Sequence, residues 1–238
     1  MRNTADWRQP GGPMFYEPDK NDHGLPHAPF KSCIVPRPIA WVSTLSKAGI
    51  VNLAPFSQCN ILGWDPPYIM FSANTHHDGR RKDSVINAEE TGEFVFNMAT
   101  WALREAVVLT SHIMEPGIDE MAAAGLTPEP SRLVKPPRVK ETPISFECRH
   151  HQTLVLPCDT PGTATSMVVG RVIGVHIADE VISPTGKIDI LKVRPLARMG
   201  YLDYTSVTDI FELRPEGTSD RTVIGMSGGK AGVKRAAE

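Results

Sequence analysis

The sequence predicts a mainly β fold, a β-barrel with helices added to it. Short runs of alternating apolar and polar residues recur along the chain, and turn-forming residues separate them. Proline and glycine are plentiful, with 21 and 19 copies among 238 residues, which favours many short strands over a helical bundle. Strands do not alternate regularly with helices and no GxGxxG motif occurs, so a doubly wound sheet with a dinucleotide site is disfavoured.

The alternating runs predict the strands in order. The first run ends at a hairpin turn at residues 47–49, and the second contains Pro55. Because proline cannot donate to a strand ladder, the second run is expected at a sheet edge or a bulge. Gly170 and Gly174 are expected to relieve a tightly coiled last strand. The expected strands cover residues 39–45, 51–59, 68–73, 93–98, 144–151 and 166–178.

Helices are expected at residues 83–90, 100–112 and 119–124. Asp83 and Thr100 are residue types that cap helix starts, and Gly92 is suited to end the first helix. The proline-rich segment 114–142 is expected to form a long excursion between strands. The length suits one domain, and we expect an extended arm at residues 1–30, a barrel domain at 31–215 and a flexible tail at 216–238.

Composition excludes several classes of function. The 25 Lys and Arg residues nearly balance 27 Asp and Glu residues, which argues against nucleic-acid binding and membrane-surface binding. No stretch approaches the ~20 apolar residues of a membrane span, and the N-terminus lacks a signal peptide, so a cytoplasmic protein is expected. The four cysteines form no CxxC pair, and neighbouring histidines such as His76 and His77 would point to opposite strand faces. No metal site is expected.

Two clusters contain candidate binding residues. In the first, Ser43, Asn52 and Ser57 occur where strands would otherwise be apolar, although this cluster taken alone favours ordinary hairpin chemistry, with Ser and Thr bonding local backbone. In the second, the cations at residues 80–82 directly precede the helix expected at residue 83. Because a helix start is positive, cations there favour a bound anion, and the cluster is suited to a phosphate. A solvated basic turn is about as well supported by this cluster alone.

Five motifs, taken in order, resemble the flavin reductase-like family of FMN-binding split-barrel proteins. They are Arg37-Pro, Asn52-x-Ala-Pro-Phe-Ser57, Asp65-Pro-Pro67, Lys82-Asp-Ser-x-x-Asn87 and Gly92-Glu-Phe-Val-Phe-Asn97. The resemblance covers roughly residues 35 to 210, and the segment 198–204 resembles the family's closing segment. It implies a six-stranded antiparallel split β-barrel (an FMN-binding split barrel) with inserted helices, assembled as a homodimer with FMN near the dimer interface.

The resemblance also implies which residues bind FMN. Six residues of the first cluster would flank the flavin ring and ribityl chain, namely Ser43, Thr44, Asn52, Ala54, Phe56 and Ser57. The phosphate would meet Ser72, Arg81, Lys82 and Ser84, while Asp83 would cap the helix or bond ribityl hydroxyls. Tyr201 and Tyr204 occupy the closing segment, where many small reductases of the family carry a histidine, and we expect them on the substrate side.

These features predict an FMN-dependent oxidoreductase that uses NAD(P)H to reduce flavin or a small acceptor, with a possible partner monooxygenase or redox protein. The flavin carries the chemistry, so no catalytic side chain is assigned. The missing histidine and the long excursion leave two alternatives open. One is a flavoredoxin-like FMN-binding electron carrier without direct NAD(P)H use. The other is a non-catalytic split barrel that binds haem or another small molecule.

Overall fold

The computed structural model describes residues 13–112, 114, 118–213 and 216. The chain forms two units, Met1–Val207 and Thr208–Glu238, and all the helices and strands described below belong to the first. Residues 1–12 of the expected arm and residues 217–238 of the expected tail lie outside the described part.

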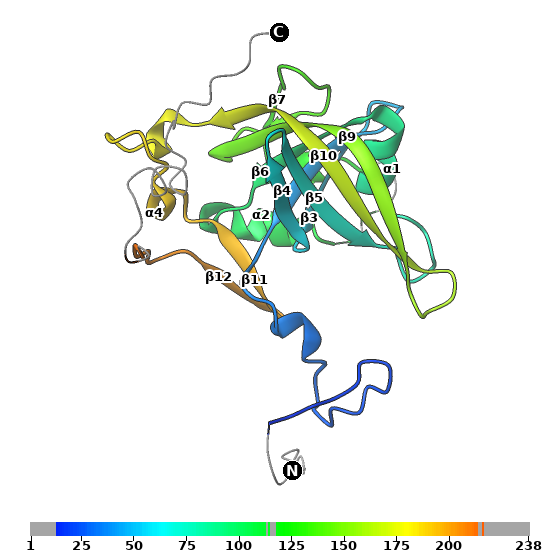
Figure 1. Ribbon diagram of the computed structural model, residues 1–238. Coiled ribbons are helices and arrows are strands. Elements are labelled where there is room, and N and C mark those ends of the chain that lie inside the picture. The colour runs from blue at the N-terminus through cyan, green and yellow to red at the C-terminus, as the bar shows by residue number, and fades with distance from the viewer. Residues whose placement is uncertain (1–12, 113, 115–117, 214–215, 217–238) are drawn as a thin grey trace. The chain divides into compact units, whose positions relative to one another are not determined.

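The fold is mainly β, as predicted, and its largest element is an antiparallel sheet (Figure 1). This sheet has seven strands in the order β3-β2-β6-β9-β10-β5-β4, one more than the resemblance implied. Its strands are β2 (Ala40–Leu45), β3 (Val51–Phe56), β4 (Cys59–Trp64), β5 (Pro67–Asn74), β6 (Glu93–Met98), β9 (Ile144–Pro157) and β10 (Ala164–Ile177).

Smaller elements surround this sheet. A three-stranded sheet consists of β1 (Arg37–Pro38), β11 (Leu196–Gly200) and β12 (Asp203–Ser206), and β7 (Pro128–Glu129) pairs with β8 (Arg138–Val139). The α-helices are α1 (Asp83–Thr91), α2 (Arg104–Leu109), α3 (Glu120–Ala123) and α4 (Ile190–Val193). Short 3-10 helices cover Phe30–Ser32, Trp101–Leu103 and Asp179–Val181. None of the described helices has the length and apolar character that a membrane span requires.

The run predicted as one strand at residues 51–59 is divided between the two edges of the large sheet. It supplies the end of β3 at Phe56 and the start of β4 at Cys59, and these strands lie at opposite ends of the strand order. Three Cα–Cα steps span at most about 11 Å, so the two edges must lie close together and the sheet must curl. Pro55 lies on the edge strand β3, as its missing N–H predicted.

Two apolar cores pack on opposite faces of β2. Ala40 and Val42 face the barrel interior, where they join Phe71, Phe94 and the α1 residue Val85. Ile39 and Trp41 lie in the other core, which α2 and α3 cover with Val107 and Met121. The indole N–H of Trp41 donates to the Thr110 hydroxyl at 2.9 Å. Because β2 is buried on both faces, the polar residues in it need partners inside the protein.

The glycines of β10 occur where its pairing with β9 is irregular. The register shifts between Val169 and Gly170 and again between Val172 and Gly174. A Cβ atom at Gly170 would lie 2.3 Å from Cζ of the buried Phe94, so only glycine allows this approach. Both glycines therefore lie at irregular points of the β9–β10 pairing, and the close approach of Phe94 requires the missing side chain only at Gly170.

Candidate functional site

A cavity of about 680 Å³ lies beside the start of α1. The edge strand β3 contributes Asn52, Ala54, Pro55 and Phe56 to its lining. The segment that enters α1 contributes His76 and the run from Arg80 to Ser84, together with Ile86. The opposite side comes from the residues after α2 and from the start of α3, namely Thr110, Ser111, His112, Met114 and Glu120.

The cationic run ends where α1 begins. Lys82 is the N-cap residue, with φ −69° and ψ 140°, and Asp83 is the first helical residue. The predicted cap at Asp83 is therefore displaced by one residue, and Lys82 forms no side-chain cap. Gly92 ends the helix in the left-handed conformation, with φ 73°, as predicted. Within the described chain the amides of Asp83 and Ser84 have no backbone acceptor, so the start of this nine-residue helix attracts an anion.

The three cations of this run have different partners. Arg81 pairs with Glu89 at 2.5 Å, and Arg80 pairs with Asp78 at 2.6 Å. Lys82 forms no ion pair with any described carboxylate, and its Nζ lies 3.2 Å from His76 Nδ1. Burial lowers the pKa of Lys82. These contacts leave Lys82 as the cation that gains most from an anion in the cavity.

His76 completes the cationic end of the cavity as a neutral acceptor. Burial lowers its pKa, and the charges of Lys82 and Arg80 lower it further. A neutral imidazole can accept a hydrogen bond at Nδ1 from the Lys82 ammonium. The histidine therefore orients Lys82 without adding charge.

The middle of the cavity contains polar groups that are already paired. The Asn52 amide donates to the Ser84 hydroxyl at 2.8 Å, joining β3 to α1. The Glu120 carboxylate accepts the Leu53 backbone N–H at 3.1 Å. Burial raises the pKa of Glu120, so its protonated form is favoured more than that of an exposed glutamate.

A second cavity, of about 570 Å³, continues from the first. Pro55, Ser111 and His112 line both. Its other side includes Ser57, Arg198 and Tyr204, and the Arg198 guanidinium lies 4.5 Å from the centre of the Tyr204 ring. Together the two cavities form a groove with a cationic end at α1 and an aromatic end at β12 (Asp203–Ser206).

The family model described as "Flavin reductase like domain" matches residues 32–196. The chain belongs to this family. The predicted membership is thus confirmed, and with it the split-barrel class, since the chain resembles a putative flavin reductase with split barrel domain from Shewanella frigidimarina. That structure has a TM-score of 0.68 and 22% identity, over 78% of this chain and 89% of that one.

Two solved structures have higher identity to this flavin reductase-like chain. Nitrilotriacetate monooxygenase component B from Bacillus cereus matches with a TM-score of 0.78 and 30% identity, over 85% of this chain and 100% of that one. The 2-nitrobenzoate 2-nitroreductase of Pseudomonas fluorescens matches with a TM-score of 0.68 and 28% identity, over 80% of this chain and 90% of that one.

Most of the predicted binding residues meet in the groove of this flavin reductase-like domain. The first cavity contains seven of them: Asn52, Ala54, Phe56, Arg81, Lys82, Asp83 and Ser84. The second contains Ser57 and Tyr204. The family motifs therefore mark a continuous surface, although their parts lie on different elements.

Four predicted residues lie elsewhere. Ser43 and Thr44 are fully buried and bond to the protein itself: Ser43 donates to the Pro137 carbonyl at 2.6 Å, and Thr44 accepts from Asn87 at 3.1 Å. Ser72 is paired on β5 and does not line the groove. Tyr201 is 48% exposed beside His27, outside the lining of both cavities.

Several groove residues were absent from the predicted set. The sequence indicates His76 only as one of two neighbouring histidines, and Arg80 only as part of the cationic run. Ser111, His112 and Glu120 come from segments whose sequence has no binding motif. Only their position opposite β3 brings them into the groove, and no local pattern signals that position. The described residues include no group of three or more His, Cys, Asp or Glu side chains that could hold a metal ion.

Proposed function

We propose that this chain is an FMN-dependent oxidoreductase that uses NAD(P)H to reduce flavin or a small acceptor. The observation that carries the proposal is the groove, which joins a cationic helix start to an apolar strand edge and an aromatic end. This order of surfaces suits a ligand with an anionic tail, a polar chain and a flat ring. Bound FMN would supply the capacity to accept and pass on a hydride.

The groove residues fit the parts of FMN in sequence. Lys82, Arg81 and the first-turn amides of α1 suit the phosphate, since they supply charge and N–H donors. Asn52 and Asp83 suit the ribityl hydroxyls. Ala54 and Phe56 on the edge strand suit one face of the ring, and β3 amides outside the ladder suit its polar rim.

The second cavity would receive the other reactant. Ser57 and Tyr204 would bind it beside the flavin, and Arg198 would supply a positive charge for an anionic reactant. The protein's contribution would be to orient the two reactants and exclude water, because the flavin itself carries the redox chemistry. We further propose a homodimer, as the family resemblance implies.

The Bacillus cereus relative supports a two-component system, because it is named as component B of a monooxygenase. The Pseudomonas fluorescens relative, a nitroreductase, supports direct reduction of an organic acceptor instead. In both cases NAD(P)H would first reduce the bound flavin, and only the acceptor of the electrons would differ. We propose a partner monooxygenase or redox protein as the acceptor in the first case, and a small organic molecule in the second.

A second candidate is an FMN-binding electron carrier that does not use NAD(P)H. It is favoured by the closing segment, where Tyr201, Asp203 and Tyr204 stand in place of a histidine. Arg198 stacked on Tyr204 at 4.5 Å also occupies part of the space beside the proposed ring position. A partner protein would then supply the electrons.

A visible spectrum of the purified protein tests both candidates. We expect flavin absorbance, bleached without oxygen by NADH or NADPH. Retained flavin that dithionite bleaches and neither nicotinamide does would favour the electron carrier. A colourless protein that leaves FMN fluorescence unchanged in a titration would overturn both and favour a barrel that binds another small molecule.

A further inference from the structure

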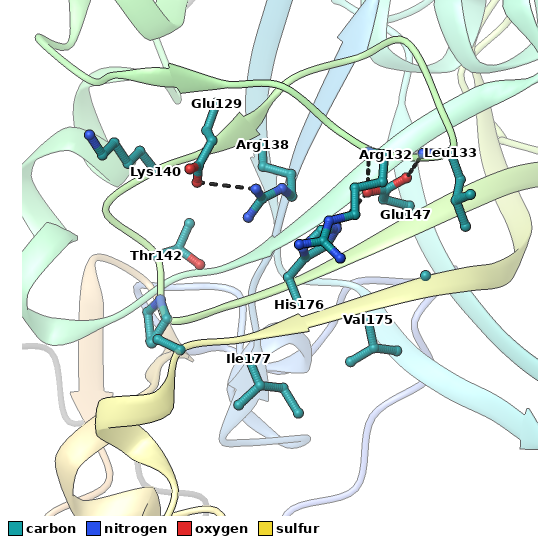
Figure 2. Close-up of a pocket in the computed structure, with 13 residues that line it drawn as sticks. Glu129, Arg132, Leu133, Arg138, Lys140, Thr142, Glu147, Val175, His176 and Ile177 are labelled. Atoms are coloured by element: carbon teal, nitrogen blue, oxygen red, sulfur yellow. Dashed lines mark hydrogen bonds and ion pairs between the residues drawn. The ribbon is translucent and has the colours of Figure 1, made fainter.

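A polar cavity of about 590 Å³ lies apart from the groove, between the loop that follows β7 and the strands β9 and β10 (Figure 2). It shares no lining residue with either groove cavity. We propose that this cavity binds a small dianion, presented by a phosphate group or by two neighbouring carboxylates. Binding at this cavity is independent of the proposed function.

The buried acid of this cavity is already surrounded by hydrogen-bond donors of the protein. Glu147 is fully buried, and its carboxylate accepts the backbone N–H groups of Arg132 at 2.7 Å, Leu133 at 2.5 Å and Val134 at 3.2 Å. His176 Nε2 lies 2.5 Å from the same carboxylate. With four donors around it, the ionised Glu147 carboxylate holds the loop in place, and the protein itself stabilises its charge.

Only one nitrogen of the Arg138 guanidinium, Nη2, has hydrogen-bond partners among the described residues. Its Nη2 pairs with Glu129 at 3.1 Å and lies 3.5 Å from the Pro130 carbonyl. Its Nε is buried and has no acceptor among the described residues, and no described acceptor meets its Nη1. The Arg138 side chain is 16% exposed, so its charge is partly desolvated and gains strongly from a further anionic partner.

Two further cations line the cavity without a partner. Arg132 and Lys140 are exposed, and within the described chain neither side chain forms an ion pair or a hydrogen bond. In Figure 2, Arg138 lies between Lys140 and Arg132, so the three cations extend along one side of the cavity. Since Glu129 and Glu147 are both engaged, the unpaired charge of the cavity is positive, which suits a ligand with more than one negative charge.

Calorimetric titration of the whole chain with inorganic phosphate tests the proposal, at constant ionic strength with sodium chloride. The cations at residues 80–82 can also bind phosphate, so the titration is performed in a Lys82→Glu background. Arg138→Gln is the test variant, and Arg132→Gln is a second one that leaves the buried part of the cavity intact. Arg171→Gln is the matched control, because Arg171 is exposed on β10 and does not line this cavity.

We expect phosphate to bind in the Lys82→Glu background and each test variant to lose at least about tenfold in affinity, with the control unchanged. A parallel titration with succinate identifies the preferred source of the dianion. Absence of binding at millimolar phosphate and succinate would overturn the proposal. So would equal affinities in the test and control variants, when thermal unfolding shows that all are folded. Loss of binding through Lys82→Glu alone would assign the anion to the groove, against the proposal.

Discussion

The side-chain oxygen of Asn97 accepts the backbone N–H of Val139 at 2.9 Å, joining the interior strand β6 to a residue 42 positions later. The same oxygen accepts the Ser145 hydroxyl at 3.1 Å. The Asn97 amide donates to the Trp41 carbonyl and to the Ser43 hydroxyl, each at 3.1 Å. The buried Asn97 side chain thus connects the long excursion to the strands β2, β6 and β9, and Ser43 is one of its hydrogen-bond partners.

Replacing Asn97 with alanine should destabilise the protein by about 2–4 kcal/mol, because several buried polar groups lose their partner at once. The free energy of unfolding from urea denaturation measures this. Asn74→Ala is the control, since Asn74 is exposed and bonds only Thr165 among the described residues, and it should change stability by less than about 0.5 kcal/mol. Similar losses of unfolding free energy in the two variants would mean that the Asn97 hydrogen-bond network does not stabilise the fold.

Replacing Lys82 with glutamate should weaken FMN binding at least about tenfold, because a negative charge would replace the unpaired cation at the helix start. Binding is measured by quenching of flavin fluorescence, with riboflavin as the phosphate-free ligand. Riboflavin affinity should hardly change. Lys187→Glu is the control, since Lys187 is exposed and lies outside the groove, and it should leave both affinities as they are. Equal losses for FMN and riboflavin would remove Lys82 from the phosphate site.

The parts of the site that could be predicted from sequence are those encoded locally. The cations at residues 80–82, the start of α1 and the Gly92 stop are neighbours in the chain, so their spacing alone predicts that the cations lie at a helix start. The role of Ser43 could not be predicted, because its acceptor at Pro137 lies 94 residues away in a segment with little pattern. A polar residue in a strand can bind a ligand or belong to a buried hydrogen-bond network, and the local sequence does not distinguish the two.

The large sheet has one strand more than predicted because a single sequence run forms two strands. Residues 51–59 look like one extended run, and no local signal shows that its halves pair at opposite edges of the sheet. Only the pairing partners distinguish them: β3 pairs with β2, whereas β4 pairs with β5. Sheet closure is a tertiary property, so the local sequence predicts the strands better than their boundaries.

Replacing Gly170 with alanine should cost about 1–3 kcal/mol, because the new Cβ would overlap the buried Phe94 ring. Gly174→Ala is the matched control on the same strand, since a Cβ there would meet its nearest atoms at 3.4 Å, an ordinary contact. Thermal or urea unfolding measures both variants. If Phe94→Leu restores stability in the Gly170→Ala protein, the overlap is the cause, and failure of that rescue would point to backbone strain instead.

Replacing Glu147 with glutamine should destabilise the protein at neutral pH by about 2–4 kcal/mol, because an amide group cannot accept hydrogen bonds from all of the donors around this position. Burial alone would raise the pKa of Glu147, but the hydrogen bonds from Arg132, His176 and Leu133 outweigh it and lower the pKa below its ordinary value. The ionised carboxylate is therefore the form that stabilises the fold.

The lowered pKa of Glu147 determines how its contribution to the free energy of unfolding depends on pH. A lowered pKa in the folded state means that the unfolded chain binds the proton more readily, so the stabilisation is present above about pH 4.3 and is lost as the pH falls. The difference in unfolding free energy between wild type and Glu147→Gln should therefore be constant from pH 7 to about 5 and narrow toward pH 3. Urea denaturation across this range measures it. A difference that widens on acidification would mean that Glu147 is protonated in the folded protein, and the carboxylate would then not hold the loop as an anion.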